Sequence, residues 1–372
     1  MELPISEKLN IGYLSQLFEH TTNCYKFFWF QAILNKLNKE KTRFTYDELI
    51  NEMIADAWYM VTEYHLRLGP NNTKDNLEEV VKYISEKEKI PSSEKREKII
   101  TYLETVQDKK IISYKKQLIK NVPYRLQKPF YQDIHVAGKW DKKPEILTEE
   151  INRQERLLYY FYLIDGLNTV IEVSPLWMEY LLKNKQILQG WLQLHLIKYL
   201  QQKNPSVPGI SDKLQAPKKR DVERVRKYWK LLIEIKPQMT EIYGDVPLMG
   251  QMISIDHFVP WQYVGHDELW NLHPTTKRIN SKKSNALPTW KEYFKKLANM
   301  EYQAYEMSKE YEIVKEKFEE CAEYHLNNAE IKNQLYGAEL KKEVFRERLG
   351  NILYPVYVSA QNCGFREWKY IP

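Results

Sequence analysis

The stretch ISIDHFVPWQYVGHDELWNLHPTTKRINSKKSNALP, residues 253–288, decides the fold of its part of the chain. Asp256 and His257 end an apolar run with β propensity, and the Pro-containing turn that follows reverses the chain. A second extended run is expected at residues 269–272, and the first turns of a helix are expected at residues 275–284. The stretch therefore predicts two strands followed by a helix.

Polar side chains recur at set distances along this stretch. Asn271 follows His257 by fourteen positions, and Asn280 follows Asn271 by nine. Two strands and a helix would bring Asp256, His257 and both asparagines to one place. Residues 283–288 then read Lys-Ser-Asn-Ala-Leu-Pro. This pattern resembles the HNH, or ββα-metal, endonuclease family, and most of all the HNH domain of CRISPR RNA-guided nucleases, where DH…N…N…K-S-[DN]-x-x-P recurs.

The chemistry of phosphodiester hydrolysis calls for these residue types. Mg²⁺ (or Mn²⁺) prefers oxygen ligands and takes only one or two protein groups, so Asp256 and Asn280 are the expected metal ligands. His257 is the expected general base, because much of an ordinary imidazole is unprotonated near neutral pH. The resemblance implies that Asn271 pins the loop between the strands and orients His257. It also implies that Lys283 lies near the scissile phosphate or the leaving group.

Simpler interpretations of these residues stand beside the catalytic one. An isolated Asp-His pair is usually a surface or capping pair, and only the accompanying asparagines and the Lys-Ser-Asn run favour catalysis. His273 has the strand parity of Asn271, but a structural or substrate-contact role is favoured over metal ligation. His266 lies in a polar turn and is expected to be exposed to solvent.

The charge distribution predicts a polyanionic partner. The chain carries 56 basic and 50 acidic residues, a net charge of +6. Residues 271–296, beside the proposed site, carry seven basic residues and one acidic residue, which is also a net charge of +6. Such a patch attracts phosphate backbones without reading their sequence, although a solvated helix face is the alternative. A second basic run, residues 218–230, fits an exposed helix and a nucleic-acid groove equally well. The expected contact residues are Lys277, Arg278, Lys282, Lys283, Lys291, Lys295 and Lys296.

Composition and local signals predict a mainly α protein, α+β overall, with the ββα-metal motif and one small β-sheet. At 372 residues, two or three domains are expected. We predict a helical N-terminal domain of unassigned role at residues 1–205 and an HNH nuclease module at 206–300, with its core at 251–290. Residues 301–372 are predicted to be C-terminal helices that pack on the body.

Several elements can be placed from short signals. Thr45 and Glu48 form a capping box that opens a helix. Residues 134–136, 158–163 and 169–173 are strand candidates for the small sheet. A helix is expected from Pro175 to about residue 202. Residues 290–326 predict one long helix, or two helices broken near Met300.

These observations together predict a cytoplasmic, metal-dependent DNA endonuclease. Three distant cysteines indicate a reducing compartment, and neither a signal peptide nor a membrane-spanning run is apparent. By analogy, the protein fits a bacterial restriction or anti-phage effector. An RNA-cleaving toxin and a non-catalytic nucleic-acid-binding adaptor are the alternatives. One site cuts one strand, so a homodimer is a hypothesis, as is a regulatory protein partner for the N-terminal helical domain.

Overall fold

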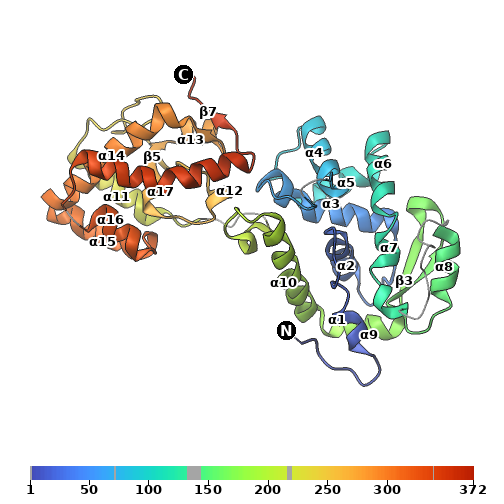
Figure 1. Cartoon of the computed structure of the whole chain (residues 1–372). Coiled ribbons are helices and arrows are strands. Elements are labelled where there is room, and N and C mark those ends of the chain that lie inside the picture. Colours follow the sequence, from blue (N-terminus) through green and yellow to red (C-terminus); the bar gives the residue numbers. More distant parts are fainter. Residues whose placement is uncertain (1, 71–72, 132–143, 216–219, 338) are drawn as a thin grey trace. The chain divides into compact units, whose positions relative to one another are not determined.

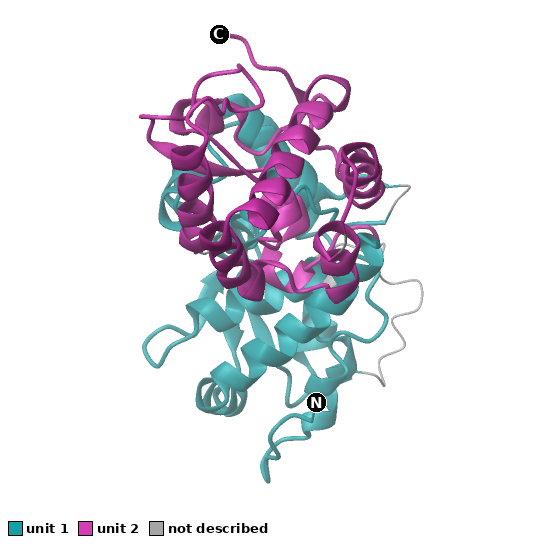
Figure 2. Cartoon of the chain, turned by 90° about the vertical axis from the view of Figure 1, so that its left-hand side faces the viewer, with its two compact units in different colours: residues 1–205, 214–216 teal, residues 206–213, 217–372 magenta. Residues whose placement is uncertain are grey.

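The computed structural model describes residues 2–70, 73–131, 144–215, 220–337 and 339–372, and Figure 1 labels their helices and strands. The chain forms two compact units, coloured separately in Figure 2. Unit 1 contains Met1–Pro205 and Leu214–Ala216, and unit 2 contains Ser206–Lys213 and Pro217–Pro372. Apart from Leu214–Ala216, unit 2 thus spans both the range predicted as the nuclease module, 206–300, and the range predicted as C-terminal helices, 301–372.

Unit 1 is built around helix α3, which packs against α2, α4 and α5. Nearly every face of α3 is buried, including the indole of Trp58. The described helices of unit 1 are α1 (Ile11–Ser15), α2 (Tyr25–Lys36), α3 (Tyr46–Thr62), α4 (Asn76–Glu88), α5 (Arg96–Thr105), α6 (Lys109–Leu118), α7 (Val122–Arg125), α8 (Pro144–Asn152), α9 (Pro175–Lys183) and α10 (Lys185–Lys203), with 3₁₀ turns η1 (Lys128–Tyr131) and η2 (Gly166–Asn168).

A three-stranded antiparallel sheet completes unit 1, in the order β1 (Arg43–Thr45), β3 (Val170–Val173) and β2 (Tyr159–Leu163). The two strands predicted at residues 158–163 and 169–173 are therefore confirmed. The candidate at residues 134–136 lies outside the described residues. Strand β1 was not predicted, because three residues directly before a helix carry too little alternation to signal a strand.

The predicted capping box is present at the start of α3. The Thr45 hydroxyl accepts a hydrogen bond from the Glu48 amide at 3.1 Å, and the Glu48 carboxylate accepts one from the Thr45 amide at 2.8 Å. These two bonds satisfy amide groups that a helix start otherwise leaves without partners. They fix the point at which β1 turns into the central helix.

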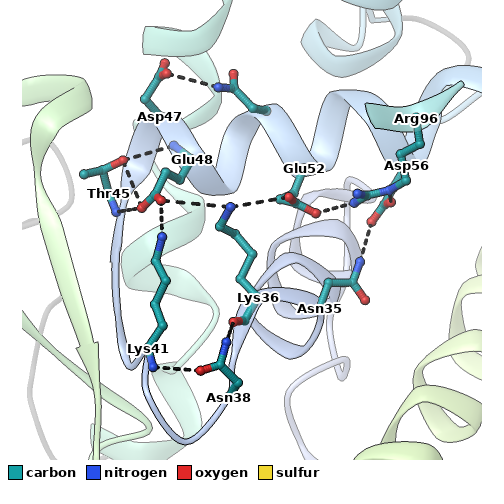
Figure 3. Close-up of polar contacts among 11 residues, drawn as sticks. Asn35, Lys36, Asn38, Lys41, Thr45, Asp47, Glu48, Glu52, Asp56 and Arg96 are labelled. Atoms are coloured by element: carbon teal, nitrogen blue, oxygen red, sulfur yellow. Dashed lines mark hydrogen bonds and ion pairs between the residues drawn. The ribbon is translucent and has the colours of Figure 1, made fainter. Parts of the chain in front are cut away.

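Ion pairs hold α2 and α5 onto α3 (Figure 3). Arg96 of α5 lies 2.9 Å from the Asp56 carboxylate and also contacts Glu52. Lys36 of α2 lies 3.6 Å from Glu52, and Asn35 donates to Asp56 at 3.2 Å. The carboxylates on this face of α3 can be buried because each one meets a cation or an amide donor.

Unit 2 combines a small antiparallel hairpin with a group of helices, in which α14 packs along both α15 and α17. The described elements of unit 2 are η3 (Ile210–Lys213), α11 (Glu223–Ile235), β4 (Ile253–His257), α12 (Trp261–Val264), η4 (Leu269–Asn271), β5 (Leu272–Thr276), α13 (Lys277–Lys283), β6 (Leu287–Pro288), α14 (Trp290–Glu310), α15 (Glu312–His325), α16 (Ala329–Tyr336), α17 (Lys342–Asn362) and β7 (Glu367–Trp368).

Strands β4 and β5 pair antiparallel, with Asp256 opposite His273, and α13 packs on both strands. The Thr276 hydroxyl caps α13 by accepting from the Ile279 amide. The expected order of strand, strand and helix is thus observed. The prediction that Asn271 lies on an extended run is wrong, because residues 269–271 form the 3₁₀ turn η4 and β5 begins only at Leu272.

Two predicted helices are divided at points that their sequences do not mark. The helix expected from Pro175 to residue 202 is two helices, α9 and α10, which meet at Asn184. The alternative of two helices within residues 290–326 is confirmed, but the break lies at Tyr311, not Met300. None of the helices in the described ranges is long and apolar enough to cross a membrane.

We predict that Thr45→Ala lowers the free energy of unfolding by about 1 kcal/mol, because it removes the hydroxyl that accepts from the Glu48 amide, whereas the bond donated by the Thr45 backbone amide remains. Chemical denaturation of the full chain measures the change. Ser113→Ala, at an exposed position of α6, is the control and should stay within about 0.5 kcal/mol of wild type. Equal losses in the two variants would show that the box contributes nothing specific.

Candidate active site

Asp256 lies near the end of β4 and is only 4% exposed. Its Oδ2 accepts a hydrogen bond from the Tyr243 hydroxyl at 2.7 Å, and its Oδ1 accepts one from Lys283 Nζ at 3.1 Å. Burial by itself would raise the pKa of Asp256, but the Lys283 charge and the Tyr243 bond outweigh it and hold the pKa below its usual value. The buried carboxylate is therefore ionised.

Lys283, in the last turn of α13, is the counter-charge of Asp256. The side chain is 1% exposed, and its ammonium also donates to the His257 carbonyl at 2.8 Å. Burial lowers the pKa of Lys283, and Asp256 partly restores it. The structure thus buries Lys283 against Asp256 and His257 and does not place it on the surface with the other predicted contact lysines.

His257 has both ring nitrogens engaged. Nδ1 lies 3.1 Å from the Arg220 guanidinium, and Nε2 lies 2.8 Å from Asp267 Oδ1. An arginine can only donate, so Nδ1 is the acceptor and Nε2 carries the proton that Asp267 accepts. Burial lowers the pKa of His257 and the Arg220 charge lowers it further, against the opposing effect of Asp267. The ring is therefore neutral, with its lone pair on Nδ1.

Asp267 and Arg220 were not among the predicted site residues. Asp267 lies in the turn before η4, where an acidic residue is normally read as solvated. Arg220 precedes α11 by only a few residues, and its guanidinium also lies 5.5 Å from the Trp261 ring centroid. No spacing rule connects it to His257 across 37 positions. Only the tertiary structure reveals these two contacts.

Asn271 is fully buried and bonds to the loop that follows β4. Its side-chain oxygen accepts from the Val259 amide at 2.8 Å, and its side-chain nitrogen donates to the Val259 carbonyl at 2.9 Å. The Phe258 amide donates to the Asn271 carbonyl at 2.9 Å. These three bonds hold the loop next to His257, so Asn271 affects the imidazole through the backbone.

Asn280 lies on α13 and faces β4. Its side-chain nitrogen donates to Ser254 Oγ at 2.8 Å and to the Ile255 carbonyl at 3.3 Å. Because both bonds use the nitrogen, the amide oxygen remains the atom that can serve a ligand. Asn280 is thus fixed beside the strand residue that precedes Asp256.

The comparisons with known proteins bear on this same segment. Residues 243–289 match the family model described as HNH endonuclease, a span that begins at Tyr243 and contains Asp256, His257, Asn271 and Lys283. The match supports an HNH domain at residues 243–289. No curated protein and no solved structure matches the chain. The domain supports a nuclease activity on nucleic acid, and Arg220 lies outside the matched span.

The oxygen donors of the HNH domain fit a hard divalent cation. Asp256 offers a carboxylate and Asn280 an amide oxygen, and Mg²⁺ or Mn²⁺ can be held by so few protein groups because it retains waters. In the described part of the chain, no cluster of three or more His, Cys, Asp or Glu side chains is suited to a metal. This donor set favours an oxygen-coordinated ion over zinc.

The other two histidines of the HNH domain are packed into it. His273 is fully buried, lies 3.7 Å from Asp256 Oδ2, and has a pKa lowered by burial to about 4. It is therefore neutral and inaccessible to a substrate, which fits the structural role. The expectation that His266 is exposed is wrong: it is half-buried, with its ring centroid 5.6 Å from that of Trp270.

The predicted basic contact residues, apart from Lys283, lie at the surface of α13 and α14. Some of them already have partners within unit 2. Arg278 donates to the Tyr370 hydroxyl at 3.0 Å, and Lys282 donates to the Ile371 carbonyl at 3.1 Å. Lys296 is only partly exposed and forms an ion pair with Asp245. The exposed members are Lys277, Arg278, Lys282, Lys291 and Lys295.

We expect Asn271→Ala to lower the free energy of unfolding by about 1–3 kcal/mol, because it leaves the buried amide and carbonyl of Val259 without partners. Asn271→Asp should also destabilise, since a carboxylate cannot donate to the Val259 carbonyl. Thermal or chemical unfolding of the full chain measures both. Asn333→Ala, at an exposed position of α16, is the control. A stability equal to the control would refute the pinning role.

Proposed function

We propose that the protein is a metal-dependent endonuclease that hydrolyses phosphodiester bonds in DNA. The observation that carries the proposal is the state of His257: a neutral imidazole with its lone pair on Nδ1, held by Asp267 and adjacent to Asp256. A general base requires this protonation state at neutral pH. The basic surface on α13 and α14 supports a polyanionic substrate.

In this mechanism, Nδ1 of His257 accepts the proton of the attacking water. Asp267 keeps the ring in the required tautomer through the Nε2 hydrogen bond and stabilises the imidazolium that forms. Asn271 keeps the loop after β4 from shifting the ring. Asp267 acts on Nε2 of His257 and Asn271 acts through the backbone, so the loss of either group should lower the rate of hydrolysis.

Arg220 occupies the position at which His257 must accept a proton. A guanidinium binds a phosphodiester through paired N–H donors, so an incoming phosphate offers Arg220 a better partner than a neutral imidazole. Arg220 would then contact the substrate and leave Nδ1 free for the attacking water. The base is thus protected in the free enzyme and released by the substrate.

Asp256 and the Asn280 oxygen would hold the divalent ion, whose charge would stabilise the transition state and the leaving oxygen. Lys283 neutralises Asp256 through Oδ1 in the present structure. The ion and the lysine would therefore both draw on the charge of the Asp256 carboxylate. Lys283 keeps its second bond, to the His257 carbonyl, and can remain beside the site.

Cleavage of plasmid DNA in Mg²⁺ or Mn²⁺ tests the proposal. We expect His257→Gln to lower the rate by about 10²–10⁴-fold, the usual contribution of a general base, while DNA binding measured in EDTA stays near that of wild type. EDTA should abolish cleavage by wild type. His195→Gln, in α10 of unit 1, is the matched control.

The outcomes separate DNA cleavage from the other functions. If labelled RNA is cut and DNA is not, the DNA endonuclease proposal is wrong and the protein is an RNA-cleaving enzyme. If the wild-type protein binds nucleic acid but cuts neither DNA nor RNA in Mg²⁺ or Mn²⁺, it is a non-catalytic binding protein.

The double variant Lys277→Ala/Lys282→Ala should weaken DNA binding for all sequences equally. If each lysine neutralises one phosphate, the slope of log K against log salt should fall by about 0.9 for each. Fluorescence anisotropy over a salt series measures the slope. Lys39→Ala/Lys98→Ala, at exposed positions of unit 1, removes the same charge and serves as the control. Equal slopes in the two variants would contradict the assigned surface.

A further inference from the structure

Unit 1 contains two adjoining cavities that share His20, Lys26 and Arg125. The larger one has a volume of about 420 Å³ and also reaches Lys128 and Glu19. The smaller one, about 130 Å³, lies against the residues that precede α2. We refer to the joined space as the cationic basin, after Lys26, Arg125 and Lys128.

The three cations of the basin line the same cavity. Lys26 is half-buried, and its ammonium donates to the Leu17 carbonyl at 3.2 Å, a neutral partner. Burial lowers the pKa of Lys26, and the charges of Lys128 and Arg125 lower it further. Glu19 is the one acidic side chain among the described lining residues. Among the described lining residues, Lys26 and Lys128 thus outnumber the one acidic side chain.

This arrangement differs from the other charged cluster of the same unit. Around α3, Arg96 meets two carboxylates, and Lys36 lies within ion-pair distance of Glu52. In the described part of unit 1, by contrast, neither Lys26 nor Lys128 forms an ion pair with a carboxylate. Cations held together in a cavity repel each other, so a bound anion would stabilise the basin.

The start of helix α2 adds to the positive potential. Residues 21–23 and Tyr25 line the smaller cavity. The N-cap residue, Cys24, makes no side-chain cap, and the first turn has no acidic residue. The amides at a helix start attract anions, and here Lys26 reinforces this potential where an acidic residue would normally oppose it.

We propose that the cationic basin binds a small phosphorylated ligand of mononucleotide size, with the phosphates placed beside Lys26 and Lys128. The volume lies within the range of small-molecule sites. Lys is a usual partner of phosphate groups, and Asn121 offers a neutral donor and acceptor for the rest of the ligand. A concave site around a half-buried lysine suits a small anion better than a nucleic-acid backbone.

Isothermal titration of the full chain with ATP, pyrophosphate and adenosine tests the proposal. The titrations are done in EDTA, so that no divalent ion bridges ATP to the HNH domain. We expect saturable binding of ATP and pyrophosphate, and binding of adenosine at least tenfold weaker. Lys26→Gln and Lys128→Gln should each weaken ATP binding at least tenfold. Lys39→Gln should change it by less than twofold.

Two further controls keep the result specific to the basin. Lys277→Ala/Lys282→Ala removes charge from the surface of unit 2 and should leave ATP binding unchanged. Lys128 is exposed, so Lys128→Gln decides the question if Lys26→Gln does not fold, as judged by thermal unfolding.

Three results would overturn the proposal. The first is no saturable binding of ATP or pyrophosphate. The second is equal weakening by Lys39→Gln and the basin variants. The third is binding of a 20-nucleotide strand, lost in Lys128→Gln, without binding of ATP, which would make the basin a nucleic-acid contact. None of these results depends on whether the HNH domain cleaves DNA.

Discussion

The buried negative charge of Asp256 is the constraint on which the candidate active site depends. A carboxylate with 4% exposure is tolerated in an ionised form only if its oxygens have strong partners. Tyr243 supplies one bond and Lys283 the other. Because Lys283 comes from α13 and Tyr243 from the segment before β4, this one charge joins three parts of unit 2. Removal of one member of such a buried ion pair typically costs about 3–5 kcal/mol of folding free energy. A substitution of Asp256 or Lys283 would therefore change the stability of unit 2 as well as the chemistry of the site.

Much of this site could be predicted from the sequence, because its signals are local. The order of two strands and a helix follows from the apolar run before Asp256 and from the Thr-capped basic helix, and the capping box at Thr45 is equally local. The division of one predicted helix at Asn184 and the 3₁₀ turn at Asn271 are not local. At Asn271, the bonds to the loop after β4 override the propensity of the chain.

The partners of the candidate site residues were less accessible to prediction. Asp267 and Arg220 meet His257 only after folding, and neither has a spacing that marks it. Lys283 was counted with the surface cations because composition does not reveal which member of a basic run turns inward. The same limitation applies to the cationic basin, whose lysines and arginine come from separate segments of unit 1. Clusters of side chains that depend on long-range contacts cannot be found from the sequence alone and require the three-dimensional structure.

The contacts of Tyr370 and Ile371 with α13 have a consequence for how a polyanion reaches the HNH domain. Strand β7 pairs with β6 just after α13, and the residues beyond it bond to Arg278 and Lys282. This segment is therefore an internal competitor for the same cations. Each cation gives one donor to this segment and keeps the others, so a ligand can either share the cation with the segment or displace these two bonds. Without residues 370 and 371, Arg278 and Lys282 would lose these two internal acceptors and offer all their donors to a ligand.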